Sequence, residues 1–154
     1  MPTLYIMVGV PGSGKTTFAK KLSIARNAIH ISSDDIRAEL FGDATIQTNN
    51  TKVFNTMHTR IFGHLTFGAN VIADATNISE WARKQIIELT PNGTKIVFVV
   101  MDTHLNESLS RNRLRDRYVP EQVIRNMWNK FQVPHEDEGG QVFFVNDEVI
   151  DDIP

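Results

Sequence analysis

A glycine-rich stretch near the start of the chain constrains the fold more than any other feature. Residues Gly9–Thr16 read GVPGSGKT and fit the pattern G-x-x-x-x-G-K-[ST]. The stretch follows the apolar run Leu4–Val8, which has strand character, and precedes Thr17–Leu22, which has helical character. A strand, a glycine loop and a helix in this order are the context of a phosphate-binding loop, or P-loop. We therefore expect this loop to bind the phosphates of a nucleotide.

The residue types in the loop explain how it can hold phosphate. Its glycines allow positive φ, so successive N–H groups can form an anion-binding nest at the positive end of a helix. Lys15 can reach the β- and γ-phosphates, and Thr16 can offer its hydroxyl to Mg²⁺. The full match in this context disfavours a simple glycine turn with a surface lysine. The expected nucleotide contacts are Gly9, Pro11, Gly12, Ser13, Gly14, Lys15, Thr16 and Thr17.

The composition is that of an ordinary globular protein. A chain of 154 residues with 41% hydrophobic and 22% charged residues can bury a core, so we expect one domain over residues 1–154. Its apolar runs are too short for a membrane span, and no signal-peptide pattern is visible. The absence of cysteine excludes a disulfide framework, and together these features favour a cytoplasmic protein. The net charge of −2 argues against a broadly basic protein that coats nucleic acid.

Strands alternate with helices along the chain. After the first strand we expect further strands near residues 28–31, 70–74, 95–101 and 142–145. Helices are expected after the loop to about residue 26, after residue 35, and over 48–67, 80–89, 105–114 and 120–131. Most strands are continuous apolar runs, which is typical of a parallel sheet covered on both faces. The sequence therefore predicts an α/β three-layer sandwich with a parallel sheet of about five strands.

Apolar side chains at helical spacing indicate which helix faces are buried. One face of the expected helix 48–67 carries Val53, Met57, Ile61 and Leu65 at every fourth position. The buried candidates of the helix after the loop are Phe18, Leu22 and Ile24. Trp81 and Trp128 lie among apolar positions and are expected in the core. The five histidines show no metal-ligand spacing, so we interpret them as structural or surface groups.

An aspartate and an arginine follow the second strand, at the sheet edge where ligands bind. Asp34 opens a helix that carries Arg37 three residues later, so both side chains can face one site. A kinase needs a carboxylate that orients an acceptor hydroxyl and takes its proton, and an arginine can clamp a substrate phosphate. The alternative is that Ser33 or Asp34 only caps the helix, a role compatible with catalysis.

Two further carboxylates end apolar strands. Asp74 has the position of a Walker-B-like acid and could bind Mg²⁺ through water. It could equally cap the turn over residues 75–77, and both interpretations stay open. Asp102 has a similar location, but its neighbours favour a helix cap.

Four arginines lie within seven residues, at positions 111, 113, 115 and 117. Arg111 and Arg115 are four residues apart and share a helix face. Arginines can neutralise the charge on a γ-phosphoryl group, so this helix could close over the nucleotide as part of a lid over residues 105–131. The alternative is an ordinary solvated helix face.

These segments together resemble the P-loop polynucleotide 5′-hydroxyl kinase family, a group of AAA-type P-loop kinases. The resemblance rests on GVPGSGKT, on ISSDDIR at 31–37, on VIADATN at 71–77, and on Arg111-Asn112 with Arg115. It continues through Val119-Pro120 and Glu138-Gly139. It implies a parallel sheet with helices on both faces and a helical lid. It also implies ATP with Mg²⁺ and a 5′-OH end of DNA or RNA as acceptor, with the kinase acting either alone or with a separate ligase or phosphatase.

The resemblance also implies roles for individual residues. Asp34 would be the general base on the 5′-hydroxyl, and Arg37 would contact the phosphate next to the accepting nucleoside. Lys15 and Thr16 would keep their P-loop roles. Arg115 would bind the donor phosphates, with Arg111 supporting it.

Two other functions remain open from the sequence. Related P-loop kinases phosphorylate small molecules, and the same aspartate–arginine pair could serve a nucleoside, sugar or antibiotic. A regulatory protein that binds nucleotide without transfer is the second alternative. The guanine-recognition string Asn-Lys-x-Asp of switch GTPases fails here, because Gln132 stands at its last position.

Overall fold

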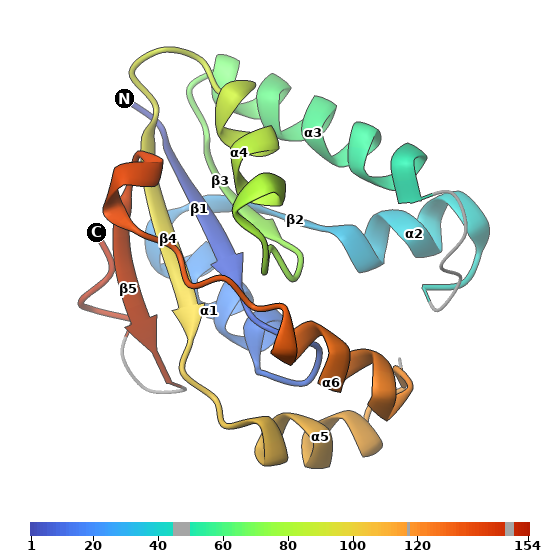
Figure 1. The fold of residues 1–154 in the computed structure, drawn as a ribbon. Helices are drawn as coiled ribbons and strands as arrows, with labels where there is room; N and C mark the ends of the chain where they lie inside the picture. The colour runs from blue at the N-terminus through green and yellow to red at the C-terminus, as the bar shows by residue number, and fades with distance from the viewer. Residues whose placement is uncertain (45–49, 117, 147–149) are drawn as a thin grey trace.

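Five parallel strands form the centre of the computed structural model, which describes residues 1–44, 50–116, 118–146 and 150–154 (Figure 1). The strand order is β2-β3-β1-β4-β5, so β1 lies in the middle and pairs with β3 and β4. The strands are β1 Thr3–Val8, β2 Ala28–Ser32, β3 Asn70–Asp74, β4 Lys95–Met101 and β5 Gln141–Val145. The predicted parallel sheet of about five strands is therefore confirmed.

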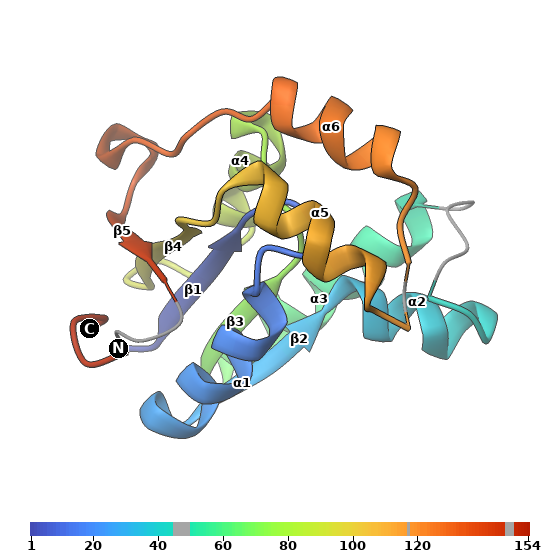
Figure 2. The same ribbon diagram turned by 90° about the horizontal axis from the view of Figure 1, so that it is seen from below.

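Helices cover both faces of the sheet, as predicted for a three-layer α/β fold. In the described residues they are α1 Lys15–Arg26, α2 Ser33–Phe41, α3 Asn50–Thr66, α4 Glu80–Glu88, α5 Leu105–Arg113 and α6 Glu121–Asn129, with a 3₁₀ turn η1 at Glu136–Glu138. Figures 1 and 2 show α1 on one face, with α3 and α4 on the other. Helices α5 and α6 lie beyond the carboxyl end of the sheet, where the lid was expected.

The side chains of β1 alternate between two hydrophobic cores, as the two-residue period of a strand requires. Leu4, Ile6 and Val8 face the core with α2, α3 and α4, which also contains the predicted stripe Val53, Met57, Ile61 and Leu65. Tyr5 and Met7 face the opposite core, which contains Phe18 and Leu22 of α1. A third, smaller core joins the lid to the loop after β1 and consists of Val10, Leu109 and Ile124.

Two predicted core residues lie at the surface instead. Ile24 is 87% exposed, because it follows Leu22 by two residues and so points to the opposite side of α1. Trp81 is 71% exposed for the same reason, since α4 is buried through Arg83, two residues later. Trp128 is 37% exposed, so the prediction that it lies in the core is also wrong; its ring lies near that of Phe131.

The helix caps differ from the predicted ones in two places. The N-cap of α2 is Ser32, whose hydroxyl accepts from the Asp35 N–H at 3.3 Å, so neither Ser33 nor Asp34 caps this helix. The N-cap of α5 is His104 rather than Asp102. The predicted helix start at Thr48 and the fourth arginine of the run, Arg117, lie outside the described residues.

None of the helices in the described part of the chain is both long and apolar enough to cross a membrane.

Candidate active site

A cleft of about 850 Å³ opens at the carboxyl ends of the central strands. The P-loop, the start of α2, the start of α3 and the two lid helices line it. It brings together the seven residues to which the sequence assigns catalytic, lid or metal roles: Lys15, Thr16, Asp34, Arg37, Asp74, Arg111 and Arg115. Eight of the ten predicted nucleotide-binding residues line it as well; Gly9 and Ser13 do not.

The P-loop has the glycine-dependent geometry that its sequence predicts. Gly12 and Gly14 have φ values of +83° and +95°, which L-residues with a side chain rarely adopt. A Cβ atom on Gly12 would lie 2.2 Å from the carbonyl oxygen of Ser108. Gly14 caps α1 without a side-chain hydrogen bond, which leaves the first-turn N–H groups of the helix for an anion in the cleft.

Lys15 lies at the base of this loop. Its Nζ donates to the carbonyl oxygen of Val10 at 3.3 Å. Burial lowers the pKa of Lys15, while the carboxylates of Asp74 and Asp34 act in the opposite direction and the charge of Arg115 lowers it further. The charges of both carboxylates of the cleft therefore act on this amine and favour its protonated form.

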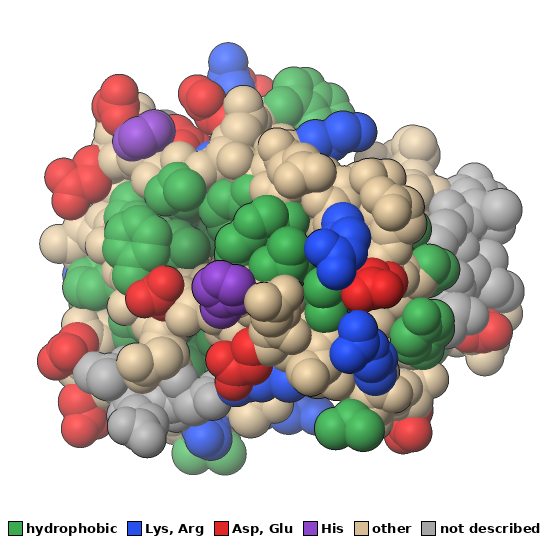
Figure 3. All heavy atoms as spheres, turned by 60° about the horizontal axis from the view of Figure 1, so that its bottom comes forward, with side chains coloured by type: hydrophobic (Ala, Val, Ile, Leu, Met, Phe, Trp, Pro, Cys, Tyr) green, Lys and Arg blue, Asp and Glu red, His purple; other side chains and the backbone are tan. Residues whose placement is uncertain are grey.

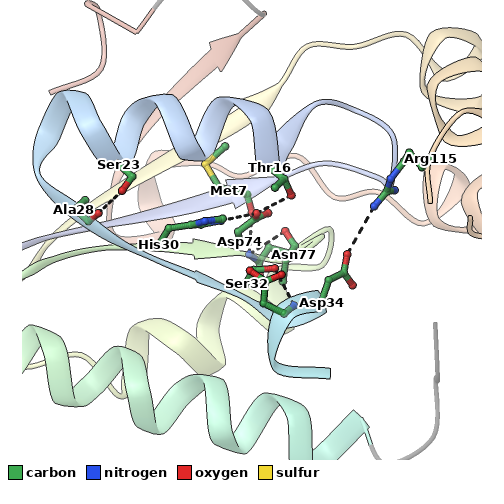
Figure 4. Close-up of polar contacts among 12 residues, drawn as sticks. Met7, Thr16, Ser23, Ala28, His30, Ser32, Asp34, Asp74, Asn77 and Arg115 are labelled. Carbon is green, nitrogen blue, oxygen red and sulfur yellow. Dashed lines mark hydrogen bonds and ion pairs between the residues drawn. The ribbon is translucent and has the colours of Figure 1, made fainter. Parts of the chain in front are cut away.

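Asp74 forms a compact polar cluster with Thr16 and His30 (Figure 4). Its Oδ2 accepts from the Thr16 hydroxyl at 2.9 Å and lies 2.8 Å from Nε2 of His30. Burial alone would raise the pKa of Asp74, but the hydrogen bond from His30 and the charge of Lys15 hold it below its usual value. The side chain thus contacts the P-loop rather than the turn at residues 75–77. A hydroxyl and a carboxylate are hard oxygen ligands, so Thr16 and Asp74 fit Mg²⁺.

His30 contacts this cluster although the sequence does not single it out. A single histidine in a strand has no ligand spacing, so the sequence predicts only a structural or surface role for it. The pattern that places His30 near Asp74 is the two-residue period of β2. His30 precedes Ser32 by two positions, and Ser32 pairs with Asp74 in the sheet. The side chains of His30 and Asp74 are therefore diagonal neighbours on one face of the sheet.

Asp34 and Arg37 are brought to the same cleft by the first turns of α2. Asp34 Oδ2 lies 3.8 Å from Nη2 of Arg115, which approaches from the lid (Figure 4). Arg37 is buried, and its Nη1 donates to Oδ1 of Asn50, the first residue of α3, at 2.7 Å. Asn50 also lines the cleft and was not predicted as a site residue.

The lid is attached to the P-loop at its base. The side chain of Thr103 donates to the carbonyl oxygen of Ser13 at 2.8 Å, and Arg111 donates to the same oxygen at 3.4 Å. Asn112 is buried and exchanges two hydrogen bonds with the backbone of Val119, which fixes the connection between α5 and α6. Arg111 and Arg115 thereby reach the cleft from a lid that contacts the loop directly.

A buried arginine supports the turn after β3. Arg83 is fully buried, donates to the carbonyl oxygen of Asn77 at 2.8 Å, and pairs with both carboxylate oxygens of Glu138. Asn77 has a positive φ of 46°, and its side chain donates to Met7 in β1 at 2.8 Å. Gly9 donates its N–H to the carbonyl oxygen of Thr76 at 2.9 Å, so this turn also supports the P-loop.

The sheet order, the P-loop, the acid at the end of β3 and the arginine-bearing lid together give this chain the fold of P-loop kinases. The chain matches the family model described as an AAA domain over residues 4–134, and it belongs to that family.

Two curated relatives are similar over most of this chain. One is "L-seryl-tRNA(Sec) kinase" of Methanococcus maripaludis, with 28% identity over 85% of this chain and 53% of its own length. The other is "Putative bifunctional polynucleotide kinase/RNA ligase" of Autographa californica nuclear polyhedrosis virus, with 28% identity over 83% of this chain and 20% of its own length. The chain therefore spans about half of the first relative and a fifth of the second.

A solved structure described as the "Pnkp1/Rnl/Hen1 RNA repair complex" contains a chain of the same fold. It superimposes with a TM-score of 0.74 and 27% identity, covering 84% of this chain and 43% of the other.

Proposed function

We propose that the protein transfers the γ-phosphoryl group of ATP to the 5′-hydroxyl end of DNA or RNA. One observation carries the proposal: Asp34 and Arg37, on one turn of α2, line the same cleft as the P-loop, and Asp34 lies 3.8 Å from the lid arginine Arg115. Residues suited to the phosphate donor and residues suited to the phosphate acceptor therefore line one cavity. The similarity to the viral polynucleotide kinase/RNA ligase and to a chain of the RNA repair complex supports a polynucleotide acceptor.

The proposed transfer assigns the proton and the leaving group to specific sites. Asp34 accepts the proton of the 5′-hydroxyl as its oxygen forms a bond to the γ-phosphorus. The bond between that phosphorus and the β–γ bridging oxygen breaks, and ADP leaves. Lys15 and the P-loop N–H groups stabilise the charge on the phosphate oxygens, and Arg115 leaves Asp34 to join them.

Thr16 and Asp74 are the proposed magnesium residues. The Thr16 hydroxyl already donates to Asp74, so its oxygen lone pairs remain for a cation. Held by these two residues, Mg²⁺ would supply positive charge that offsets the negative charge developing on the phosphate oxygens during transfer.

The charge of the cleft supports an acceptor that carries phosphate. Among the residues that the structure describes, five cations line it, Lys15, Lys21, Arg37, Arg111 and Arg115, against the two carboxylates Asp34 and Asp74. The cleft is thus positive by three charges (five minus two) in a chain of net charge −2. On the surface that Figure 3 shows, by contrast, acidic and basic side chains are interspersed among apolar ones. Positive charge is therefore concentrated where phosphates would bind.

Aromatic and apolar lining residues of the cleft support an acceptor that carries bases. They are Phe54 of α3 and the lid residues Tyr118, Val119, Pro120, Val123 and Met127. Aromatic and apolar surfaces of this kind bind the faces of nucleobases without sequence preference. A cleft that has basic residues for phosphate and apolar residues for bases suits the end of a nucleic acid better than it suits a sugar.

The seryl-tRNA kinase relative favours one second candidate, a kinase that acts on a hydroxyl attached to an RNA through another group. The structure of the RNA repair complex supports a further proposal, that a separate ligase or phosphatase acts with this kinase.

A panel of acceptors separates these candidates. We expect label from γ-labelled ATP to appear on a 5′-OH oligonucleotide and, more slowly, on a nucleoside 3′-monophosphate. A sugar, a free nucleoside and seryl-tRNA should remain unlabelled. Label on seryl-tRNA or on a sugar alone would contradict the proposal, as would ATP binding without transfer to any acceptor.

A further inference from the structure

His30 contacts the proposed magnesium site from behind the cleft. Its ring projects from β2 toward Asp74 and is 14% exposed (Figure 4). Asp74 is 3% exposed and lines the cleft, whereas His30 does not. Any role of His30 in phosphoryl transfer is therefore exerted through Asp74.

Two hydrogen bonds converge on one oxygen of this carboxylate. Oδ2 receives the Thr16 hydroxyl at 2.9 Å and lies 2.8 Å from Nε2 of His30. A carboxylate only accepts, so the ring nitrogen must be the donor. Within the described residues Oδ1 accepts no hydrogen bond. The two donors therefore fix the rotation of the side chain and leave its second oxygen available to a ligand.

We propose that His30 is a positioning residue for the magnesium site: its Nε2–H holds the Asp74 carboxylate in the orientation that a Mg²⁺–ATP complex requires. This inference rests on the proposed function, in which Thr16 and Asp74 hold Mg²⁺. Without His30, Asp74 keeps only the Thr16 hydroxyl, the same group that is expected to contact the metal. Loss of such an outer hydrogen-bond partner lowers metal affinity by about 10–100-fold.

The test compares ATP binding with and without Mg²⁺, in the absence of any acceptor. ATP dissociation constants are measured by calorimetry in Mg²⁺ and in EDTA for the wild type, His30→Ala and His30→Gln. His64→Ala is the matched control, because His64 is exposed on α3 and does not line the cleft. Thermal unfolding of each protein without ligand checks that the fold is intact.

We expect the tightening of ATP binding by Mg²⁺ to fall by roughly 10-fold or more in His30→Ala. Affinity in EDTA should stay within about twofold, and His30→Gln, whose amide can donate, should restore part of the loss. If Mg²⁺ tightens ATP binding in His30→Ala as much as in the wild type, the proposal is overturned. An equal loss of ATP affinity with and without Mg²⁺ would overturn it as well. If His30→Ala fails to fold, His30→Leu, which fills more of the space and cannot donate, takes its place, and a full tightening of ATP binding by Mg²⁺ in that variant overturns the proposal. Because no acceptor is present, these outcomes are independent of whether the oligonucleotide is phosphorylated.

Discussion

At the residue scale, Asp34 and Arg115 face each other across the cleft in a contact that is easily exchanged. Their charged atoms are 3.8 Å apart, and the side chains are 41% and 28% exposed. Partly solvated ion pairs of this kind contribute little to stability, so Arg115 can move from Asp34 to donor phosphates at small cost. This exchange would remove the Arg115 contact from the carboxylate to which the proposed mechanism assigns the acceptor hydroxyl.

The role of Asp34 is tested by Asp34→Asn, which keeps the size of the side chain but removes its basicity. We expect phosphoryl transfer to fall by roughly 10²-fold or more, while the dissociation constant for ATP stays near normal. Asp35→Asn is the control, because Asp35 is exposed and does not line the cleft. Unchanged turnover in Asp34→Asn would remove this residue from the mechanism.

Arg37 is expected to act on the acceptor rather than on the nucleotide. Arg37→Ala should raise KM for a 5′-OH oligonucleotide by roughly 10-fold or more, the cost of one charge-assisted contact to phosphate, with little change in ATP affinity. The comparison is Arg113→Ala, which removes an exposed arginine that pairs with Glu121 on the outside of the lid. Equal losses of acceptor and ATP binding would indicate damage to the fold instead.

At the scale of elements, the Arg83–Glu138 ion pair ties α4 and η1 to the turn that follows β3. Arg83 is completely buried, so removing its partner leaves an uncompensated charge in the core. Glu138→Gln should therefore lower the free energy of unfolding by about 3 kcal/mol, measured by chemical denaturation near pH 7. A loss within experimental error would contradict a supporting role for this pair.

The same pair also predicts a pH dependence of stability. Burial would raise the pKa of Glu138, but the hydrogen bonds and charge of Arg83 hold it below its usual value of 4.5. Its stabilising contribution is therefore complete above pH 4.5 and is lost as the pH falls through the lower, folded-state pKa. In Glu138→Gln, the fall in the free energy of unfolding that protonation of this carboxylate causes at low pH should be absent.

Much of this architecture could be predicted from the sequence because its signals are local. Continuous apolar runs mark the strands, and the P-loop, Asp34 and Asp74 follow strand ends that meet at one sheet edge. Contacts between distant segments could not be predicted in this way. His30 reaches Asp74 from a neighbouring strand, and Asn50 reaches Arg37 from another helix.

The errors in predicted burial have a similar origin. Ile24 and Trp81 are apolar residues in helices that bury only one narrow face, and residue type alone does not say which face that is. Helical phase relative to Leu22 and Arg83 decides it, because a separation of two residues turns a side chain to the opposite side.

At the scale of the whole molecule, a negatively charged chain surrounds a positively charged cleft. The sheet edge, α2 and the lid each contribute to it, so we propose that residues 1–154 act as one kinase unit with residues 105–131 as its lid. Its contact with acceptor phosphates is confined to the cleft. It should therefore be weaker and less salt-dependent than the binding of proteins that neutralise many phosphates.

The most direct test of the central claim uses two oligonucleotides of the same sequence, one with a 5′-hydroxyl and one with a 5′-phosphate. Each is incubated with the protein, Mg²⁺ and γ-labelled ATP, and the labelled position is mapped by end-specific digestion. We predict label on the 5′ end of the first oligonucleotide and none on the second, whose 3′-hydroxyl stays free. Label on both, on a 3′ end, or on neither would contradict a 5′-hydroxyl kinase.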